Sequence, residues 1–157
     1  MRRTSLLLVG LAGVGLGFAP APVFRERADD PAVVLRRLQG FWTVSRNEQG
    51  GRIQIPEGQA FTIQFEKDRW SFYRSLNGGP LIWCDSYALE LDPRATPTEL
   101  DFVHPATKKH KFHGVYDLKG NTMKIVFRDN ANGTKGRAKD LVNPAPGDWF
   151  MQLERRP

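Results

Sequence analysis

Three histidines between positions 104 and 113 are the side chains best suited to bind a metal ion. His104, His110 and His113 would form such a site if they converged with a carboxylate such as Asp101. His110 and His113 are three positions apart, and in a strand that spacing places them on opposite faces. A loop that begins at Pro105 separates His104 from both. The sequence therefore favours a solvated loop, and we predict no metal site.

A lone cysteine is the next candidate for chemistry. Cys84 is the only cysteine of the chain, so no internal disulfide can form. As a nucleophile it would need a base such as His113 beside it. No motif surrounds Cys84, and a single cysteine in a strand usually contributes to packing. We predict no catalytic role for it.

Paired carboxylates are required for glycoside hydrolysis, where two acids face each other across a cleft. The acidic pairs of the chain are Asp29 with Asp30, Glu66 with Asp68, and Glu99 with Asp101. The first pair precedes a helix, the second lies in a hairpin turn, and the third lies on the outward face of a strand. None is predicted to face a partner across a cleft. We therefore expect no catalytic residue and no cofactor.

The basic residues are spread rather than concentrated. The net charge is +6, and the loss of Arg2 and Arg3 with a leader would reduce it to +4. The stretches 108–111 and 128–139 are basic and would allow phosphate contacts beside aromatic rings. Basic loops on an exported domain more often contact anionic envelope polymers or keep the protein soluble. We expect no nucleic-acid partner.

The first 21 residues have the order of a secretory signal peptide. Met1-Arg2-Arg3 is positive, residues 6–19 are apolar and uncharged, and Ala19-Pro20-Ala21 is a small-residue site. The apolar run is shorter than the roughly 20 residues of a membrane span. Proline follows both candidate cleavage points, so the cleavage site and an uncleaved anchor stay open. We predict a signal peptide over 1–21, a linker over 22–29 and a domain over 30–157. The protein is then exported to the periplasm or the exterior, with no membrane span after cleavage.

One short helix is expected at the start of the domain. Asp30 is a good cap, and Pro31 fits the first helical position. Val34, Leu35 and Leu38 share one face of the segment. A helix of about two turns is not stable alone in water, so we expect it to cover one end of the domain.

About eight strands follow, and they predict an all-β antiparallel up-and-down barrel. Their apolar residues alternate with polar ones, and turn signals separate them. In the segment 81–91, Trp83, Tyr87 and Leu89 are expected to share one face. The predicted strands are 42–47, 61–65, 70–73, 81–91, 99–103, 112–118, 122–127 and 149–155, with a short edge segment at 53–56.

The short helix followed by Gly40-x-Trp42 resembles the opening of a lipocalin, with Gly40 permitting the bend into the first strand. The resemblance implies that Trp42 closes one end of the barrel beneath a basic side chain from the end of the last strand. Arg155 has the matching place, or failing that Arg156. An arginine over an indole ring contributes roughly 0.5–2 kcal/mol.

A closer resemblance covers most of the mature chain. Residues 38–42, the block 114–125 and Gly136-Arg137 are similar to an uncharacterised family of small secreted lipocalin-like domains that is abundant in planctomycete bacteria. That family typically has Arg-Pro in the late loop. Here Ala138 follows Arg137, which predicts a different course for the loop. The resemblance implies no catalytic residues.

The leading hypothesis for function is non-covalent binding of a small apolar or amphipathic molecule at the open end of a monomeric barrel. Because large inward side chains can also fill a small barrel, a solid core is the alternative. The protein would then be a cell-envelope interaction or structural module that contacts a polymer or protein through its loops, chiefly 128–147. The residues expected to line a ligand pocket are Phe61, Ile63, Phe72, Tyr87, Phe102, Phe112, Tyr116 and Ile125.

Overall fold

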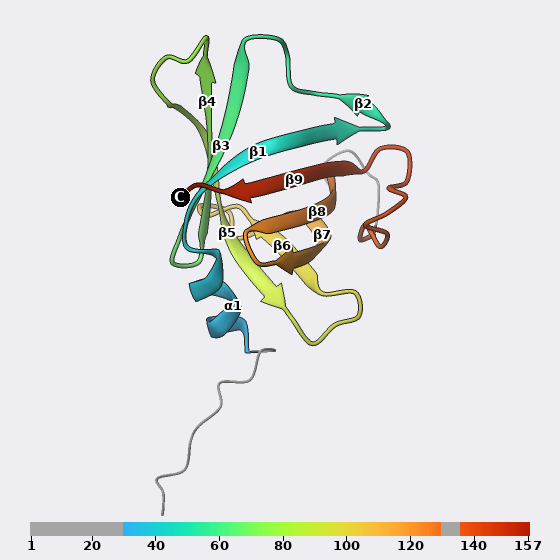
Figure 1. The fold of residues 1–157 in the computed structure, drawn as a ribbon. Helices are drawn as coiled ribbons and strands as arrows, with labels where there is room; N and C mark the ends of the chain where they lie inside the picture. Colours follow the sequence, from blue (N-terminus) through green and yellow to red (C-terminus); the bar gives the residue numbers. More distant parts are fainter. Residues whose placement is uncertain (1–29, 130–135) are drawn as a thin grey trace, which may run out of the picture.

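The computed structural model describes residues 30–129 and 136–157 (Figure 1). The predicted signal peptide (1–21) and linker (22–29) lie outside these residues, as does part of the late loop. In the described ranges, no helix has both the length and the apolar composition needed to cross a membrane. The elements are α1 (Pro31–Leu38), β1 (Gly40–Gln49), β2 (Arg52–Ile53), β3 (Gln59–Glu66), β4 (Arg69–Leu76), β5 (Ile82–Asp92), β6 (Glu99–Val103), β7 (His110–Lys119), β8 (Thr122–Asp129) and β9 (Trp149–Arg155).

The strands form a closed antiparallel barrel, which confirms the predicted fold class. β1 pairs with β3, each strand from β3 to β8 pairs with the next strand of the chain, and β9 returns to pair with β1. This seam runs from Trp42, opposite Arg155, to Gln49, opposite Trp149. The short β2 pairs only with β1 and lies outside the ring of eight strands. The architecture is consistent with a lipocalin-like barrel that opens with one short helix.

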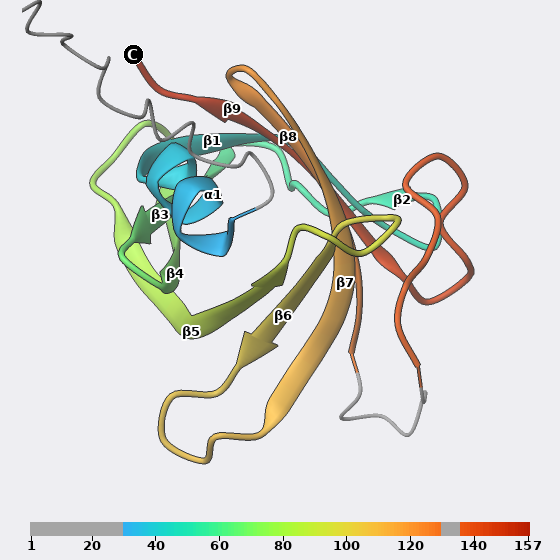
Figure 2. The same ribbon diagram turned by 90° about the horizontal axis from the view of Figure 1, so that it is seen from below.

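The helix α1 lies across one end of the barrel (Figure 2). Asp30 caps it by accepting a hydrogen bond from the amide of Ala32 at 2.8 Å, and Val34 and Leu38 are buried against the barrel core. Gly40 then has φ +109°, a left-handed conformation that favours glycine. The chain can therefore turn from the helix directly into β1, so the helix covers this end.

The barrel beneath the helix is filled with side chains. Its fully buried members come from α1 and five strands, and they pack together in one core cluster. They are Leu38, Trp42, Ile63, Phe65, Leu100, Met123, Ile125 and Leu153. The half of the barrel beneath α1 thus has the solid core that the alternative hypothesis predicts for the entire barrel.

A second, smaller apolar cluster lies on the outer surface of the barrel. Val115, Val126 and Phe150 are buried there together with Ala138 from the late loop. Arg137 holds the same loop, because its Nη2 donates to Asp101 Oδ2 at 2.9 Å and its Nη1 donates to the carbonyl of Gly114 at 2.8 Å. The small side chain of Ala138 fits this buried position between the loop and the barrel. The Gly-Arg motif of the late loop therefore has a structural role in this protein.

Three strands contain a β-bulge in the half of the barrel away from α1. The extra residues are Ser45 in β1, Cys84 in β5 and Lys111 in β7, which have no register partner on β9, β4 and β6 respectively. A bulge reverses the face on which the following side chains lie. The prediction for Trp83 was wrong for this reason: it lies opposite Tyr73 on the outer surface and is 60% exposed, whereas Tyr87 points inward.

Candidate functional site

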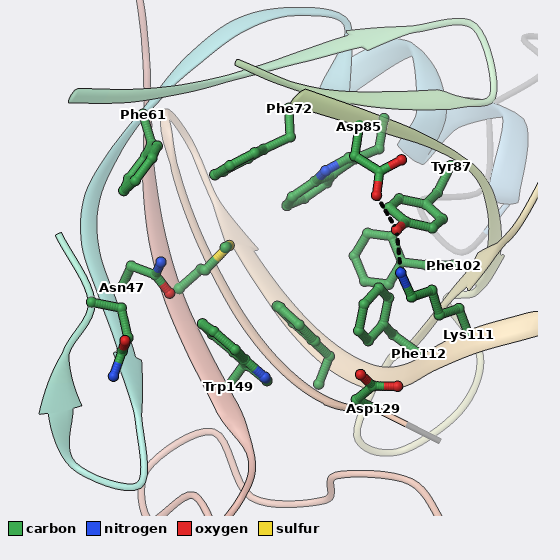
Figure 3. A pocket seen from close by; sticks show the side chains of 14 residues that line it. Asn47, Phe61, Phe72, Asp85, Tyr87, Phe102, Lys111, Phe112, Asp129 and Trp149 are labelled. Carbon is green, nitrogen blue, oxygen red and sulfur yellow. Dashed lines mark hydrogen bonds between the residues drawn. The ribbon is translucent and has the colours of Figure 1, made fainter. Parts of the chain in front are cut away.

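The end of the barrel opposite α1 contains a cavity of about 410 Å³ (Figure 3). Most of its lining comes from the halves of the strands that lie farther from the helix. Eight of the fourteen lining side chains are aromatic. The lining residues are Asn47, Gln54, Phe61, Trp70, Phe72, Asp85, Tyr87, Phe102, Lys111, Phe112, Phe127, Asp129, Trp149 and Met151.

Two pairs of stacked rings form apolar walls. The rings of Phe61 and Phe72 have centroids 5.1 Å apart and planes 27° apart. Those of Phe127 and Trp149 have centroids 6.2 Å apart and are nearly parallel, at 3°. Both pairs join residues on neighbouring strands, because Phe61 and Phe72 alternate inward on β3 and β4, and Phe127 lies opposite Trp149 across β8 and β9. The walls present flat apolar faces to a ligand.

The floor of the cavity separates it from the solid half of the barrel. Trp70 and Phe102 meet there edge to face, with centroids 4.9 Å apart. Both rings are buried. Phe112 contacts Phe102 and Phe127 edge to face as well, at 5.8 and 5.3 Å. Edge-to-face contacts fix the ring orientations, so the cavity is shaped before any ligand enters.

A chain of three polar side chains crosses one side of the cavity (Figure 3). The phenol of Tyr87 donates to Asp85 Oδ2 and accepts from Lys111 Nζ at 2.7 Å. The same ammonium lies 5.1 Å from the ring centroids of Tyr87 and Phe112. Asp85 also accepts from the amide of Ser86 at 2.8 Å. The cavity thus has an ordered polar side next to its aromatic walls.

The Tyr87 phenol stays protonated at neutral pH. Burial raises its pKa above the ordinary value, and the hydrogen bond to Asp85 and the charges of Asp85 and Asp129 raise it further. A neutral phenol is a hydrogen-bond donor and not a nucleophile or base. The chain of Asp85, Tyr87 and Lys111 thus presents fixed hydrogen-bonding groups at this side of the cavity.

A buried amide lies across the cavity from this chain (Figure 3). Asn47 is only 4% exposed, and its Oδ1 has no hydrogen-bond partner among the described residues. A buried acceptor without a partner costs roughly 1–3 kcal/mol.

No family model, curated protein or solved structure matches this chain.

The structure divides the predicted pocket residues between the two halves of the barrel. Phe61, Phe72, Tyr87, Phe102 and Phe112 line the cavity. The other three, Ile63, Tyr116 and Ile125, are buried in the core and do not line it. They point inward as expected, but each lies at least two residues nearer to the closed end than a lining residue of its own strand.

The polar lining residues were missed from the sequence, and the bulges explain two of them. The extra residue at Ser45 turns Asn47 inward in place of Arg46, and Lys111 is itself the extra residue of β7. Simple alternation predicts neither position. Asp85 is different, because it lies two residues before Tyr87 on the same face of β5. That spacing alone would have identified it.

The residues that were considered for other chemistry lie elsewhere. His113 Nδ1 contacts Asp101 Oδ2 at 2.9 Å on the outer surface, beside Arg137. The Nδ1 of His104 accepts from the amide of Thr107 at 3.3 Å, and Cys84 is exposed. Within the described ranges, no three His, Cys, Asp or Glu side chains are grouped so as to hold a metal ion.

The barrel-closure residues gather at the helix end. Trp42 Nε1 donates to the carbonyl of Leu38 at 2.7 Å, which fixes the end of α1 to β1. Arg155 lies over Trp42 and donates to the carbonyls of Arg37 and Gln39. Arg156 instead donates to Thr43 Oγ1 at 3.1 Å and to Thr62 Oγ1 at 2.8 Å on the outer surface. Arg155 thus has the position over Trp42 that the resemblance implied.

Proposed function

We propose that this barrel binds a small amphipathic molecule in the cavity at its open end, without covalent chemistry. The observation that carries the proposal is the cavity of about 410 Å³ between two stacked aromatic pairs, with polar groups along its sides. Ligand pockets typically measure roughly 300–1,000 Å³ and combine apolar walls with a few placed polar groups. The lining has both properties.

The shape of the walls favours a ligand with a flat apolar body. A ring that stacks on Trp149, or on Phe61 and Phe72, would bury its own apolar surface and the faces of the protein rings together. Each aromatic contact contributes roughly 0.5–1.5 kcal/mol beyond the area buried. Because edge-to-face contacts already hold the rings, little side-chain ordering opposes binding.

The chemistry of the lining supports binding and not catalysis. Among the described lining residues, the titratable groups are Asp85, Tyr87, Lys111 and Asp129. The raised pKa of Tyr87 keeps its phenol neutral, and the lining residues that the structure describes include no cysteine, serine or histidine. The predicted leader supports an exported carrier or sensor, acting as a monomer in the periplasm or outside the cell.

The alternative of an envelope module with a solid barrel has less support. A solid barrel requires side chains along the whole axis, and they fill only the half beneath α1. The late loop, from residue 136 onward, packs on the barrel surface through Arg137 and Ala138. Its role there is structural, so it gives no separate support to a partner surface.

A titration with the neutral apolar fluorophore N-phenyl-1-naphthylamine tests the proposal. We expect saturable binding of one equivalent, seen as a rise in its fluorescence and as quenching of the tryptophans that line the cavity. Phe72→Ala removes one ring of a stacked pair and should weaken binding by about three- to tenfold. Phe41→Ala is the matched control, because Phe41 is a partly exposed phenylalanine on the outer face of the barrel. Absence of saturation, or equal loss in both variants, would show that the cavity is not the binding site.

A further inference from the structure

We infer that the hairpin between β4 and β5 docks this barrel on a lipid bilayer with anionic headgroups. The hairpin, residues 74–84, lies at the end of the barrel opposite α1 (Figure 1). Its apolar turn enters the lipid surface, and basic side chains around the open end contact the headgroups. The inference goes beyond the proposed function and does not depend on it.

The hairpin carries most of the large apolar side chains that the described residues expose. Seven such side chains are exposed, and four of them belong to this hairpin: Leu76, Leu81, Ile82 and Trp83. Each of the four is between 41% and 60% exposed. Every residue from 76 to 84 is exposed to solvent. A contiguous apolar patch of this kind typically marks a site of interaction with a protein or a membrane.

The backbone holds this apolar tip in place. Trp83 lies opposite Tyr73, one residue before the bulge at Cys84, so its indole is on the outer surface of the barrel. The amide of Asn77 donates to the carbonyl of Gly58 at 2.7 Å, which fixes the turn to the neighbouring loop. The tip is therefore ordered before it meets a surface, and little ordering of side chains or backbone opposes docking.

The exposed charges around the open end are mainly positive. In the turn 50–58, the hairpin and the turn 104–109, four exposed basic residues stand against one exposed carboxylate, that of Glu57; the four are Arg52, Arg74, Lys108 and Lys109. In the late loop, the exposed Lys139 and Asp140 offset each other. A basic residue near an anionic lipid surface strengthens binding about fivefold. The charge of this end therefore complements anionic headgroups.

The shape and the residue types of the patch favour a bilayer over a protein partner. Protein interfaces are broad and bury roughly 800 Å² on each partner, whereas these apolar side chains project from one hairpin. Tryptophan is enriched where apolar lipid meets water, because its ring is apolar and its N–H is polar. The basic residues lie on separate turns around the open end, and one flat anionic surface can contact them together. Docked in this way, the cavity opens toward the lipid.

Quenching of tryptophan fluorescence by brominated lipids tests the inference on the full-length protein. One set of vesicles contains equal parts of phosphatidylglycerol and phosphatidylcholine, and the other contains phosphatidylcholine alone; both have bromine on the acyl chains near the headgroups. No tryptophan lies in residues 1–29, so the signal comes from the barrel and not from the predicted leader. We expect quenching with the anionic vesicles. The lipid concentration for half-maximal quenching should rise at least fivefold with the neutral vesicles or with added salt.

Variants at the two ends of the barrel assign the binding to the hairpin. Trp83→Ala should remove most of the quenching. Ile82→Ala keeps every tryptophan and should raise the lipid concentration for half-maximal quenching about fivefold or more. Phe41→Ala is its matched control, because Phe41 is 42% exposed but lies next to α1. Arg74→Gln should weaken binding to the anionic vesicles about fivefold, whereas Arg69→Gln, at the other end of β4, should not.

Several outcomes would overturn the inference. Absence of quenching in the wild-type protein would show that the hairpin does not enter a bilayer, and equal quenching by neutral and anionic vesicles would exclude a role for the headgroup charge. Quenching that persists in Trp83→Ala would mean that lipid reaches the tryptophans elsewhere, such as in the cavity. A dimer in sedimentation equilibrium that Trp83→Ala dissociates would assign the patch to a second copy of the chain. The fluorophore titration is a separate measurement, so the proposed function stands or fails independently.

Discussion

The guanidinium of Arg155 lies over the indole of Trp42, with its central carbon 4.6 Å from the ring centroid. The two residues also face each other across the seam between the first and last strands of the barrel. Arg155 donates in addition to two carbonyls at the end of α1. One pair of residues thus joins the helix, the first strand and the last strand. The closed end of the barrel depends on it.

The first prediction concerns this pair. Trp42→Ala removes a fully buried indole and its hydrogen bond to Leu38, so it should lower the free energy of unfolding by roughly 3–5 kcal/mol. Urea unfolding monitored by far-UV circular dichroism measures the change. Trp83→Ala is the control, because Trp83 lies on the outer surface and should change stability by only about 0.5 kcal/mol. Similar losses in the two variants would show that Trp42 does not close the barrel.

The second prediction concerns the unpartnered amide in the cavity. Asn47→Leu replaces a buried acceptor without a partner by an apolar group, and we expect it to stabilise the ligand-free protein by about 1 kcal/mol. Thr62→Val is the contrasting variant. Thr62 is also buried, but its hydroxyl accepts a hydrogen bond from Arg156, so removal of this hydroxyl should destabilise the protein. A destabilised Asn47→Leu protein would mean that Asn47 is held by the fold and not available to a ligand.

The third prediction concerns the late loop. Arg137→Ala removes the contacts of its guanidinium with Asp101, Glu99 and the Gly114 carbonyl. It should therefore release residues 136–148 while the barrel stays folded. Hydrogen exchange should accelerate in that segment and not in β3 or β4, with a loss of about 1–3 kcal/mol in stability. Arg52→Ala, at an exposed residue of the short strand β2, serves as the control. Uniform exchange throughout the protein would contradict a local role.

The fourth prediction concerns alkaline pH. Burial raises the pKa of Tyr116 to about 12; the charge of Arg37 opposes this shift and that of Asp92 adds to it. An unfolded tyrosine has a pKa of about 10. The protonated phenol thus stabilises the folded state below about pH 10, and that contribution is lost as the pH rises toward 12. Absorbance titration of the phenolates should show a late step that Tyr116→Phe removes. If the variant lacks only a step near pH 10, Tyr116 is not buried as described.

The sequence was sufficient for the architecture because alternation and turns are local signals. It placed Trp42 and the inward stripes of β3, β6 and β8 correctly, and the helix was expected within one residue of its bounds. It could not say how far along the barrel the side chains fill the axis, since Ile63 and Phe61 follow the same pattern. It also could not locate bulges, which leave no mark in composition. For that reason the sequence did not predict that Trp83 faces outward, or that Asn47 and Lys111 line the cavity.

The positions of the bulges bear on how such a barrel can change during evolution. Each extra residue lies in the open half, whereas Trp42 and Arg155 fix the register at the other end. Insertion or deletion of a single residue near the rim therefore exchanges the inward and outward side chains of a strand end without altering the alignment that keeps the protein folded. A single change of length near the rim can thus replace the side chains that line the cavity while the register at the closed end is kept.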